Sequence, residues 1–356
     1  MPFSRTIFLT GFPGFIAERL VERLSAADRQ IFLLVQPEFV SRAIEQVEAI
    51  AERTGTPLEN FALFEGDITQ PDLGMAGEDI ELVRSTATDV FHLAAVYDLA
   101  VAEELALKVN VQGTKNVNAF AASVTSLRRY SYISTCYVAG KRTGRILEDE
   151  LEHDAGFRNF YEESKYLAEA EVEKLKAELP VTVFRPSVVV GDSLTGETAK
   201  YDGIYYLIQY LLRAPGVLRL VNVGNSNVRL NLVPVDFVVT SIAALAFDEE
   251  AIGKTIALAD PDPLTTKDLF DVLAENLSGK RSVISPPLSL VEWSLLLPAS
   301  PPATGLPHSA VPYFFIAQTY DTATADRLLA KHNIYCPNFQ DYAENLIKFV
   351  KKHPQL

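Results

Sequence analysis

The chain contains 356 residues, in which 32 lysines and arginines face 46 aspartates and glutamates, giving a net charge of -14. This acidic balance argues against a nucleic-acid protein, whose phosphate contacts need a basic face, and against a polybasic membrane anchor. Two cysteines and five scattered histidines provide neither a disulfide framework nor a metal-ligand cluster, so we expect no metal. Because no run approaches about 18 apolar residues, we expect a cytoplasmic protein without a transmembrane segment.

The first predicted unit is a strand, a glycine turn and a helix. Residues 6–9 are mostly β-formers, and Ile16, Leu20 and Leu24 repeat at helical spacing. Glycines let the backbone approach a diphosphate, and a helix N-terminus offers free N–H groups and a positive dipole end. The spacing GxxGxxA also fits an ordinary strand-to-helix loop. If the turn holds a dinucleotide, the residues in contact are Gly11, Phe12, Pro13, Gly14, Phe15 and Ile16.

The second strand, predicted over residues 30–35, ends at Gln36. A dinucleotide fold places the residue that contacts the adenosine ribose at this position. An acidic residue there favours NAD and an arginine favours NADP. The neutral Gln36 leaves the choice open, and Arg42 is the nearby candidate for a 2′-phosphate.

Two further strands end in residues that suit a ligand. The strand over 61–68 ends in a turn whose aspartate either binds the adenine amino group or forms an ordinary Asx turn. The strand over 89–95 ends in two alanines, which leave room for a ligand or simply pack in the core. These strand ends contain Asp67, Ile68, Ala94 and Ala95.

Hydroxyl and amine side chains follow in the next helices and strand. A helix over 102–123 contains Asn110, and an Asn in a helix interior needs partners for its amide. The strand over 129–133 is followed by Thr135. Tyr161 and Lys165 then lie one turn apart on the same face of a helix. A Tyr-xxx-Lys pair alone is common on protein surfaces, but after a glycine turn and a hydroxyl-bearing strand end it indicates a catalytic pair.

Strands and helices alternate as far as the strand over 181–185, which predicts an α/β fold with a doubly wound parallel sheet, a Rossmann fold. Beyond it, residues 281–318 are apolar, rich in proline and contain the sole tryptophan, Trp293. They form either an irregular core cover or a lid over an apolar substrate. We expect an NAD(P)-binding domain over residues 1–192 and about 229–260. A smaller, mainly C-terminal substrate-binding region is expected over residues 193–228 and about 261–356.

With these motifs the chain resembles the extended short-chain dehydrogenase/reductases. Their TGxxGxxA turn, strand-end hydroxyl, YxxxK pair and following RP turn correspond to Thr10–Ala17, Thr135, Tyr161 with Lys165, and Arg185 with Pro186. Within that group it is similar to fatty acyl-CoA reductases of the male-sterility type and to thioester reductase domains. That branch usually has Arg where Gln36 stands, so its NADPH preference is weakened here.

The resemblance implies roles for the site residues. Tyr161 is the expected general acid, and Lys165 together with a nicotinamide ring lowers the pKa of that tyrosine. Lys165 also binds the nicotinamide ribose, and Thr135 holds the substrate carbonyl. Ser134 is the less favoured alternative to Thr135. We expect NADP, with NAD as the alternative, bound by the residues named above together with Asn110, Pro186, Ser187 and Val188.

Three functions follow as hypotheses. The first is NAD(P)H-dependent reduction of an apolar acyl thioester, on CoA or on a carrier, to an aldehyde or onward to an alcohol. The second is a dehydrogenase, reductase or epimerase acting on a ketone, an alcohol or a nucleotide sugar. The third is a dinucleotide sensor without turnover, which retention of both Tyr161 and Lys165 disfavours. We expect a monomer or a homodimer.

Overall fold

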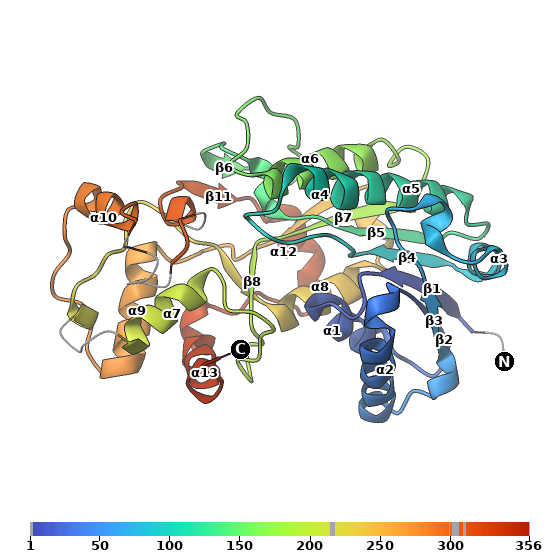
Figure 1. The fold of residues 1–356 in the computed structure, drawn as a ribbon, viewed down its shortest axis with the longest axis horizontal. Coiled ribbons are helices and arrows are strands. Elements are labelled where there is room, and N and C mark those ends of the chain that lie inside the picture. The colour runs from blue at the N-terminus through green and yellow to red at the C-terminus, as the bar shows by residue number, and fades with distance from the viewer. Residues whose placement is uncertain (1–2, 214–217, 299, 301–305, 309–310, 356) are drawn as a thin grey trace.

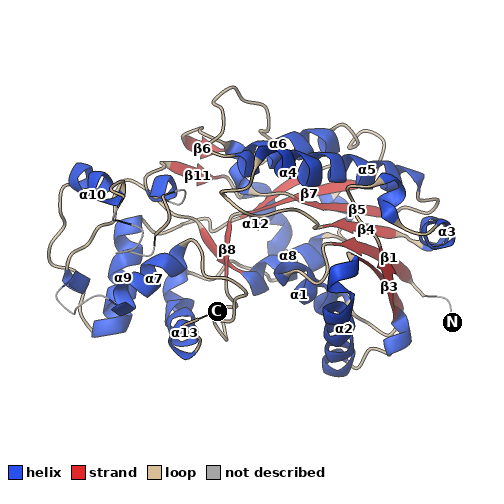
Figure 2. Cartoon of the chain, in the orientation of Figure 1, coloured by secondary structure: helices blue, strands red, loops and turns tan. Residues whose placement is uncertain are grey.

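A seven-stranded parallel sheet lies at the centre of the computed structural model, which describes residues 3–213, 218–298, 300, 306–308 and 311–355. The strand order is β10-β7-β5-β4-β1-β2-β3 (Figures 1 and 2). Successive strands are added on one side of β1 as far as β3 and on its other side from β4 onward, so the strand order reverses between β1 and β4. This arrangement confirms the predicted doubly wound α/β fold. In chain order the strands are β1 (Arg5–Thr10), β2 (Arg29–Val35), β3 (Phe61–Glu65), β4 (Asp89–His92), β5 (Arg129–Ile133), β7 (Val181–Pro186) and β10 (Thr255–Leu258).

Helices cover both faces of this sheet because its strands are apolar on both sides. In β1, Ile7 and Leu9 pack into the core on one face while Phe8 packs into the core on the other. The first face is covered by α1 (Phe15–Leu24), α2 (Val40–Thr54), α8 (Val235–Leu245) and α12 (Ala323–Ala330). The second is covered by α3 (Gly77–Thr86), α5 (Gly113–Ser123) and α6 (Phe160–Glu173).

A separate hydrophobic core lies beside the sheet, at the left of Figure 1. It joins residues from β8 and β9 to three helices, and its largest fully buried members include Tyr205, Phe270 and Tyr342. The elements of this side are β8 (Val188–Val190), α7 (Ile204–Arg213), β9 (Leu232–Pro234), α9 (Thr266–Ser278), α10 (Leu288–Leu295) and α13 (Phe339–Lys352). The last-but-one helix, α12, packs instead against α8 and β10 of the main sheet. No described helix is both long enough and apolar enough to cross a membrane.

Two details depart from the elements that the sequence predicts. The expected helix over 102–123 begins as α4 (Glu103–Ala106), widens into a π-helical segment (Leu107–Gln112), and continues as α5. Two three-residue strands, β6 (Gly144–Ile146) and β11 (Gln318–Tyr320), form a small parallel pair that joins the chain's two halves. Strands this short have no measurable apolar periodicity, and therefore the sequence gives no signal for them.

Candidate active site

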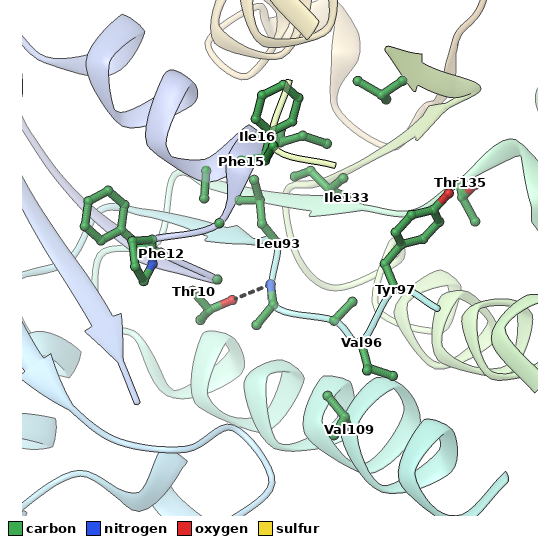
Figure 3. Close-up of a pocket in the computed structure, with 18 of the residues that line it drawn as sticks. Thr10, Phe12, Phe15, Ile16, Leu93, Val96, Tyr97, Val109, Ile133 and Thr135 are labelled. Carbon is green, nitrogen blue, oxygen red and sulfur yellow. Dashed lines mark hydrogen bonds between the residues drawn. The ribbon is translucent and has the colours of Figure 1, made fainter. Parts of the chain in front are cut away.

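A cavity of about 810 Å³ opens at the carboxyl ends of the strands, where β1 and β4 lie side by side. Parallel sheets bind ligands at this reversal point. Figure 3 shows Phe12 and Phe15 of the glycine turn on one side of the cavity, and Tyr97 and Thr135 on the other. The cavity thus extends from the glycine turn to the predicted catalytic residues.

The glycine turn brings the backbone close to the end of β4. Gly11 has a φ of +96°, and a Cβ on it would lie 2.7 Å from the amide nitrogen of Ala94. Gly14 is the N-cap of α1, and no side chain caps this helix end. The first-turn N–H groups of a helix have no carbonyl partner within it. An anionic group such as a diphosphate therefore fits here.

A second feature that suits a ligand lies between β7 and β8. The side chain of Ser187 is 8% exposed and lines the cavity between Pro186 and Val188. Its Oγ is buried without a hydrogen-bond partner among the described residues. A buried hydroxyl of this kind ordinarily has a partner, and a polar group of a dinucleotide would supply one.

Tyr161 stands at the start of α6 with its side chain on the cavity wall. Asn159 caps this helix by accepting a hydrogen bond from the Glu162 N–H. The Tyr161 hydroxyl is hydrogen-bonded to that of Thr135, which follows β5 and also lines the cavity. The two side chains, each 7% exposed, are therefore oriented together at one point of the wall.

Burial raises the pKa of Tyr161, and the hydrogen bond from Thr135 opposes this only in part. Lys165 is not among the causes of this raised pKa, and the lowering expected from Lys165 together with a nicotinamide ring stays a prediction. Lys165 donates from Nζ to the Tyr132 hydroxyl at 3.1 Å and to the Ile133 carbonyl at 2.9 Å, both at the end of β5. Its own pKa is lowered to about 8 by burial, with Glu169 opposing.

Ser134, the alternative carbonyl holder, is already occupied. Its Oγ donates a hydrogen bond to the carboxylate of Glu169, which also accepts 2.9 Å from Arg185 Nε. Arg185 belongs to the predicted RP turn, so this buried ion pair anchors α6 to β7. The Thr135 hydroxyl, by contrast, is bonded to Tyr161 and accepts from the Tyr137 N–H at 3.2 Å, which supports Thr135 as the hydroxyl that acts beside the predicted acid.

The adenosine end of the cavity has a mixed charge. Gln36 and Arg42 line it, and no described residue pairs with the Arg42 guanidinium. Glu38, two residues after Gln36, lines the same part of the cavity, and the motifs in the sequence did not point to this carboxylate. Asp67 also lines it, while its carboxylate accepts hydrogen bonds of 2.9 Å from both the backbone N–H and the hydroxyl of Thr69, as an Asx turn does.

Of the predicted cofactor contacts, Asn110 is the one that does not line the cavity among the described residues. Its side chain accepts from the Val96 N–H at 2.8 Å and donates to the Val96 carbonyl at 3.3 Å and to Ser164 Oγ at 2.9 Å. These bonds satisfy the amide completely on its donor side. Asn110 holds the loop after β4 against α6, which is a structural role. The contacts that do line it are Gly11, Phe12, Pro13, Gly14, Phe15, Ile16, Gln36, Arg42, Asp67, Ile68, Ala94, Ala95, Tyr161, Lys165, Pro186, Ser187 and Val188.

The predicted lid, residues 281–318, contributes no described residue to the cavity wall. Trp293 and Leu296 are 61% and 57% exposed, and Phe314 and Phe315 pack beside Leu306 in a small cluster of their own. Positions 299, 301–305 and 309–310 of this segment lie outside the described residues. The apolar wall nearest Tyr161 is made by other residues, among them Val96, Tyr97, Leu105 and Tyr137.

Residues 9–242 match the family model described as male sterility protein. The chain belongs to this family. It is accordingly an NAD(P)-binding oxidoreductase of the extended short-chain dehydrogenase/reductase type, as the sequence motifs predict. The match includes the glycine turn, Thr135, Tyr161 and Lys165.

Curated relatives of this male sterility family member are longer proteins. It is 26% identical over 282 residues to the fatty acyl-CoA reductase wat of Drosophila melanogaster, covering 69% of this chain and 54% of the relative. It is 28% identical over 322 residues to the non-canonical nonribosomal peptide synthetase FrzA of Cladobotryum sp, covering 85% of this chain and 30% of the relative. The chain thus spans about half or less of these relatives.

Solved structures share the fold over nearly the whole chain. The terminal R domain from the myxalamid PKS-NRPS pathway superposes with a TM-score of 0.83 at 23% identity, covering 100% of this chain and 93% of that one. UDP-glucuronic acid 4-epimerase from Bacillus cereus, solved in complex with NAD, gives 0.68 at 18% identity, covering 98% and 100%. At these identities the comparison shows the fold alone.

Proposed function

We propose that this family member reduces an apolar acyl thioester to an aldehyde at the expense of NADPH. The observation that carries the proposal is the position of Thr135 and Tyr161, whose hydroxyls meet on the wall of a cavity that begins at the glycine turn. The relatives named as fatty acyl-CoA reductases support the thioester as substrate. The apolar wall beside Tyr161 supports an acyl chain.

The chain's own residues account for the proton and for the orientation of the substrate. A nicotinamide bound between the glycine turn and Ser187 would supply a hydride. Thr135 and Tyr161 hydrogen-bond the thioester oxygen, and Tyr161 donates its proton as charge develops there. The resulting hemithioacetal loses the thiol and leaves an aldehyde. One NAD(P)H and one proton are consumed for each aldehyde and thiol formed.

The pKa of Tyr161 bears on this step. Because burial raises it, the tyrosine stays protonated throughout the neutral range and is competent as an acid but not as a base. Protonated Lys165 supplies the nearby positive charge that favours the tyrosinate formed after proton transfer. Reduction is therefore expected to proceed at neutral pH and to decline as pH rises through about 8, where Lys165 loses its proton.

Substrate chain length tests the apolar wall. Leu105 lines the cavity and is 48% exposed, whereas Leu82, on α3, is also 48% exposed and lies outside the cavity lining. Each buried methylene is worth about 0.8 kcal/mol, so kcat/KM should rise about fourfold per carbon until the wall is filled. Leu105→Asp should flatten this rise, and Leu82→Asp should leave it unchanged. A flat series in the unmodified protein would contradict an apolar acyl substrate.

NADPH is the proposed cofactor because Arg42 lines the adenosine end of the cavity, where none of the described residues pairs with its guanidinium, and could bind a 2′-phosphate. Glu38 opposes this choice by charge. Dissociation constants for NADPH and NADH, measured by fluorescence titration, decide between the two. Tighter binding of NADH would contradict the NADPH assignment without affecting the assignment of the reacting residues.

A further inference from the structure

A continuous buried hydrogen-bond chain connects the catalytic lysine with the glycine turn. The Tyr132 hydroxyl accepts from Lys165 Nζ and is hydrogen-bonded to the hydroxyl of Thr114. Thr114 Oγ1 lies 3.0 Å from His92 Nε2, and His92 Nδ1 lies 2.8 Å from Thr10 Oγ1. Thr10 in turn accepts from the Ala94 N–H at 3.2 Å, the bond drawn in Figure 3.

This chain is shielded from water along its whole length. Its side-chain members, from Thr10 to Lys165, are each no more than 3% exposed. Burial, with a smaller contribution from the Lys165 charge, lowers the pKa of His92 to about 3, so its ring is neutral and has one donor and one acceptor nitrogen. The neutral His92 ring can therefore donate a hydrogen bond to one of the two threonine hydroxyls and accept a hydrogen bond from the other.

The far end of the chain determines what it can do. It stops at the Ala94 peptide N–H, which does not release its proton, and therefore the chain is not a route for protons to solvent. What it does supply is a fixed orientation for the Tyr132 hydroxyl. Buried polar networks that are fully satisfied rigidify the groups at their ends.

We propose that Tyr132 is a positioning residue for Lys165. The Thr114–His92–Thr10 hydrogen-bond chain fixes the Tyr132 hydroxyl and thereby the position of the lysine ammonium relative to the glycine turn. The lysine ammonium has three N–H donors. Tyr132 and the Ile133 carbonyl take two of them, which leaves the third for the cavity that Lys165 lines. Without the Tyr132 hydroxyl, the ammonium keeps the Ile133 carbonyl and its place 4.7 Å from the ring centroid, but it loses one of its two acceptors.

The charged state of Lys165 depends on this contact as well. A hydrogen bond accepted from an ammonium favours its protonated form, so removal of the hydroxyl makes protonation less favourable. Other titratable groups around the lysine remain in place when Tyr132 is changed; they are Glu169 and Tyr161 on α6, His92 on β4, and Arg185 on β7 through its pair with Glu169. A change in the pH profile would therefore report the Tyr132 contact itself.

Tyr132→Phe removes this hydroxyl and keeps the buried ring. Tyr130→Phe is a matched control, because Tyr130 lies two residues earlier on β5, is also fully buried and donates a 2.6 Å hydrogen bond to Asn118, away from Lys165. Tyr132→Phe loses the hydrogen bonds to Lys165 and Thr114, and Tyr130→Phe loses the one to Asn118, so thermal unfolding should show a loss of stability in both variants. Only Tyr132→Phe should change the behaviour of the lysine.

The readout is the affinity for NADPH across the neutral and alkaline range, with kcat measured beside it where turnover is found. For Tyr132→Phe the alkaline decline in affinity should move to lower pH by about one unit, and kcat should fall about tenfold, the effect of one hydrogen bond to a charged group. Tyr130→Phe should keep the wild-type pH profile. An unchanged profile for Tyr132→Phe, or an equal shift in both variants, would overturn the proposal.

Only the measurement of kcat rests on the proposed reductase function; the measurement of NADPH affinity against pH does not. If the protein reduces no acyl thioester while the binding profile of Tyr132→Phe still shifts, the proposed function fails and the positioning role stands. If thioesters are reduced but the profile does not shift, the positioning role fails alone.

Discussion

The replacement of Tyr161 by Phe separates proton donation from every other property of the site. The ring stays in its buried place, so the fold loses little more than the hydrogen bond to Thr135, worth about 1 kcal/mol. Cofactor affinity should stay close to that of the wild type, because the backbone turn and Ser187 are unchanged. Turnover, by contrast, loses its acid.

The size of the loss follows from the chemistry. General acid catalysis contributes about 10²- to 10⁴-fold, which corresponds to about 2.7–5.4 kcal/mol of the barrier at 1.36 kcal/mol for each factor of ten. The buried site admits few substitute donors, since Thr135 is the hydroxyl bonded to Tyr161, while Ser134 is engaged with Glu169. We therefore expect a loss in the upper part of that range.

The assay is the decrease of nicotinamide absorbance at saturating cofactor and thioester, with NADPH affinity measured separately by fluorescence. Tyr130→Phe, which changes a buried tyrosine away from the cavity, is the control for nonspecific damage. A Tyr161→Phe enzyme that kept more than about a tenth of the wild-type kcat, well above the expected range, would show that another group donates the proton.

Four further substitutions have defined outcomes. Arg42→Ala should weaken NADPH binding and spare NADH, while Glu38→Gln should strengthen NADPH binding; titration with both cofactors checks this pair. Gly11→Ala should abolish cofactor binding and lower the melting temperature, because its Cβ would meet the Ala94 nitrogen at 2.7 Å in a positive-φ turn. Because the pKa of His92 is lowered to about 3, this histidine takes up a proton below about pH 6.5 in the unfolded chain but only near pH 3 in the folded chain. The free energy of unfolding should therefore fall as the pH is lowered from about 6.5 to about 3. It should fall less steeply in His92→Gln, as denaturant titrations at a series of pH values would show.

Much of the fold follows from local pattern. The alternation of apolar strands with amphipathic helices predicts the doubly wound sheet, because the central strands β1, β4, β5 and β7 are buried along almost their whole length and the helices cover them with apolar sides. The π-helical segment around Asn110 has no such signal, and within it Asn110 bonds to Val96 and Ser164, residues distant in sequence. Tertiary partners of this kind are not encoded in a window of neighbouring residues.

The site residues that belong to sequence motifs were predictable, whereas those that reach the site through tertiary packing were not. The glycine turn, Thr135 and the Tyr161–Lys165 pair stand at fixed spacings, and all of them line one cavity. The carboxylate of Glu38 was missed because only the residue directly after the second strand, Gln36, was considered, although Glu38 follows two residues later. The segment 281–318 was expected over the substrate from its apolar composition, but composition does not say which face of the molecule a segment covers.

The partners of Lys165 were also beyond the sequence. Helical spacing brings Lys165 near Tyr161, but it does not show that the ammonium turns toward the end of β5. The bond between Tyr132 and Lys165 joins residues 33 positions apart, and the one between Thr10 and His92 joins residues 82 positions apart. Such bonds follow only from the order of strands in the sheet.

Release of thiol during cofactor oxidation tests the central claim most directly. The purified protein would be mixed with NADPH and, in turn, with acyl-CoAs of rising chain length, ketones and nucleotide sugars, while a thiol reagent and nicotinamide absorbance are followed together. The account predicts thiol release with apolar acyl thioesters, at one NADPH per thiol if the product is the aldehyde and two if it is the alcohol. Oxidation of NADPH by ketones, or turnover of nucleotide sugars, without thiol release from any acyl thioester would contradict it.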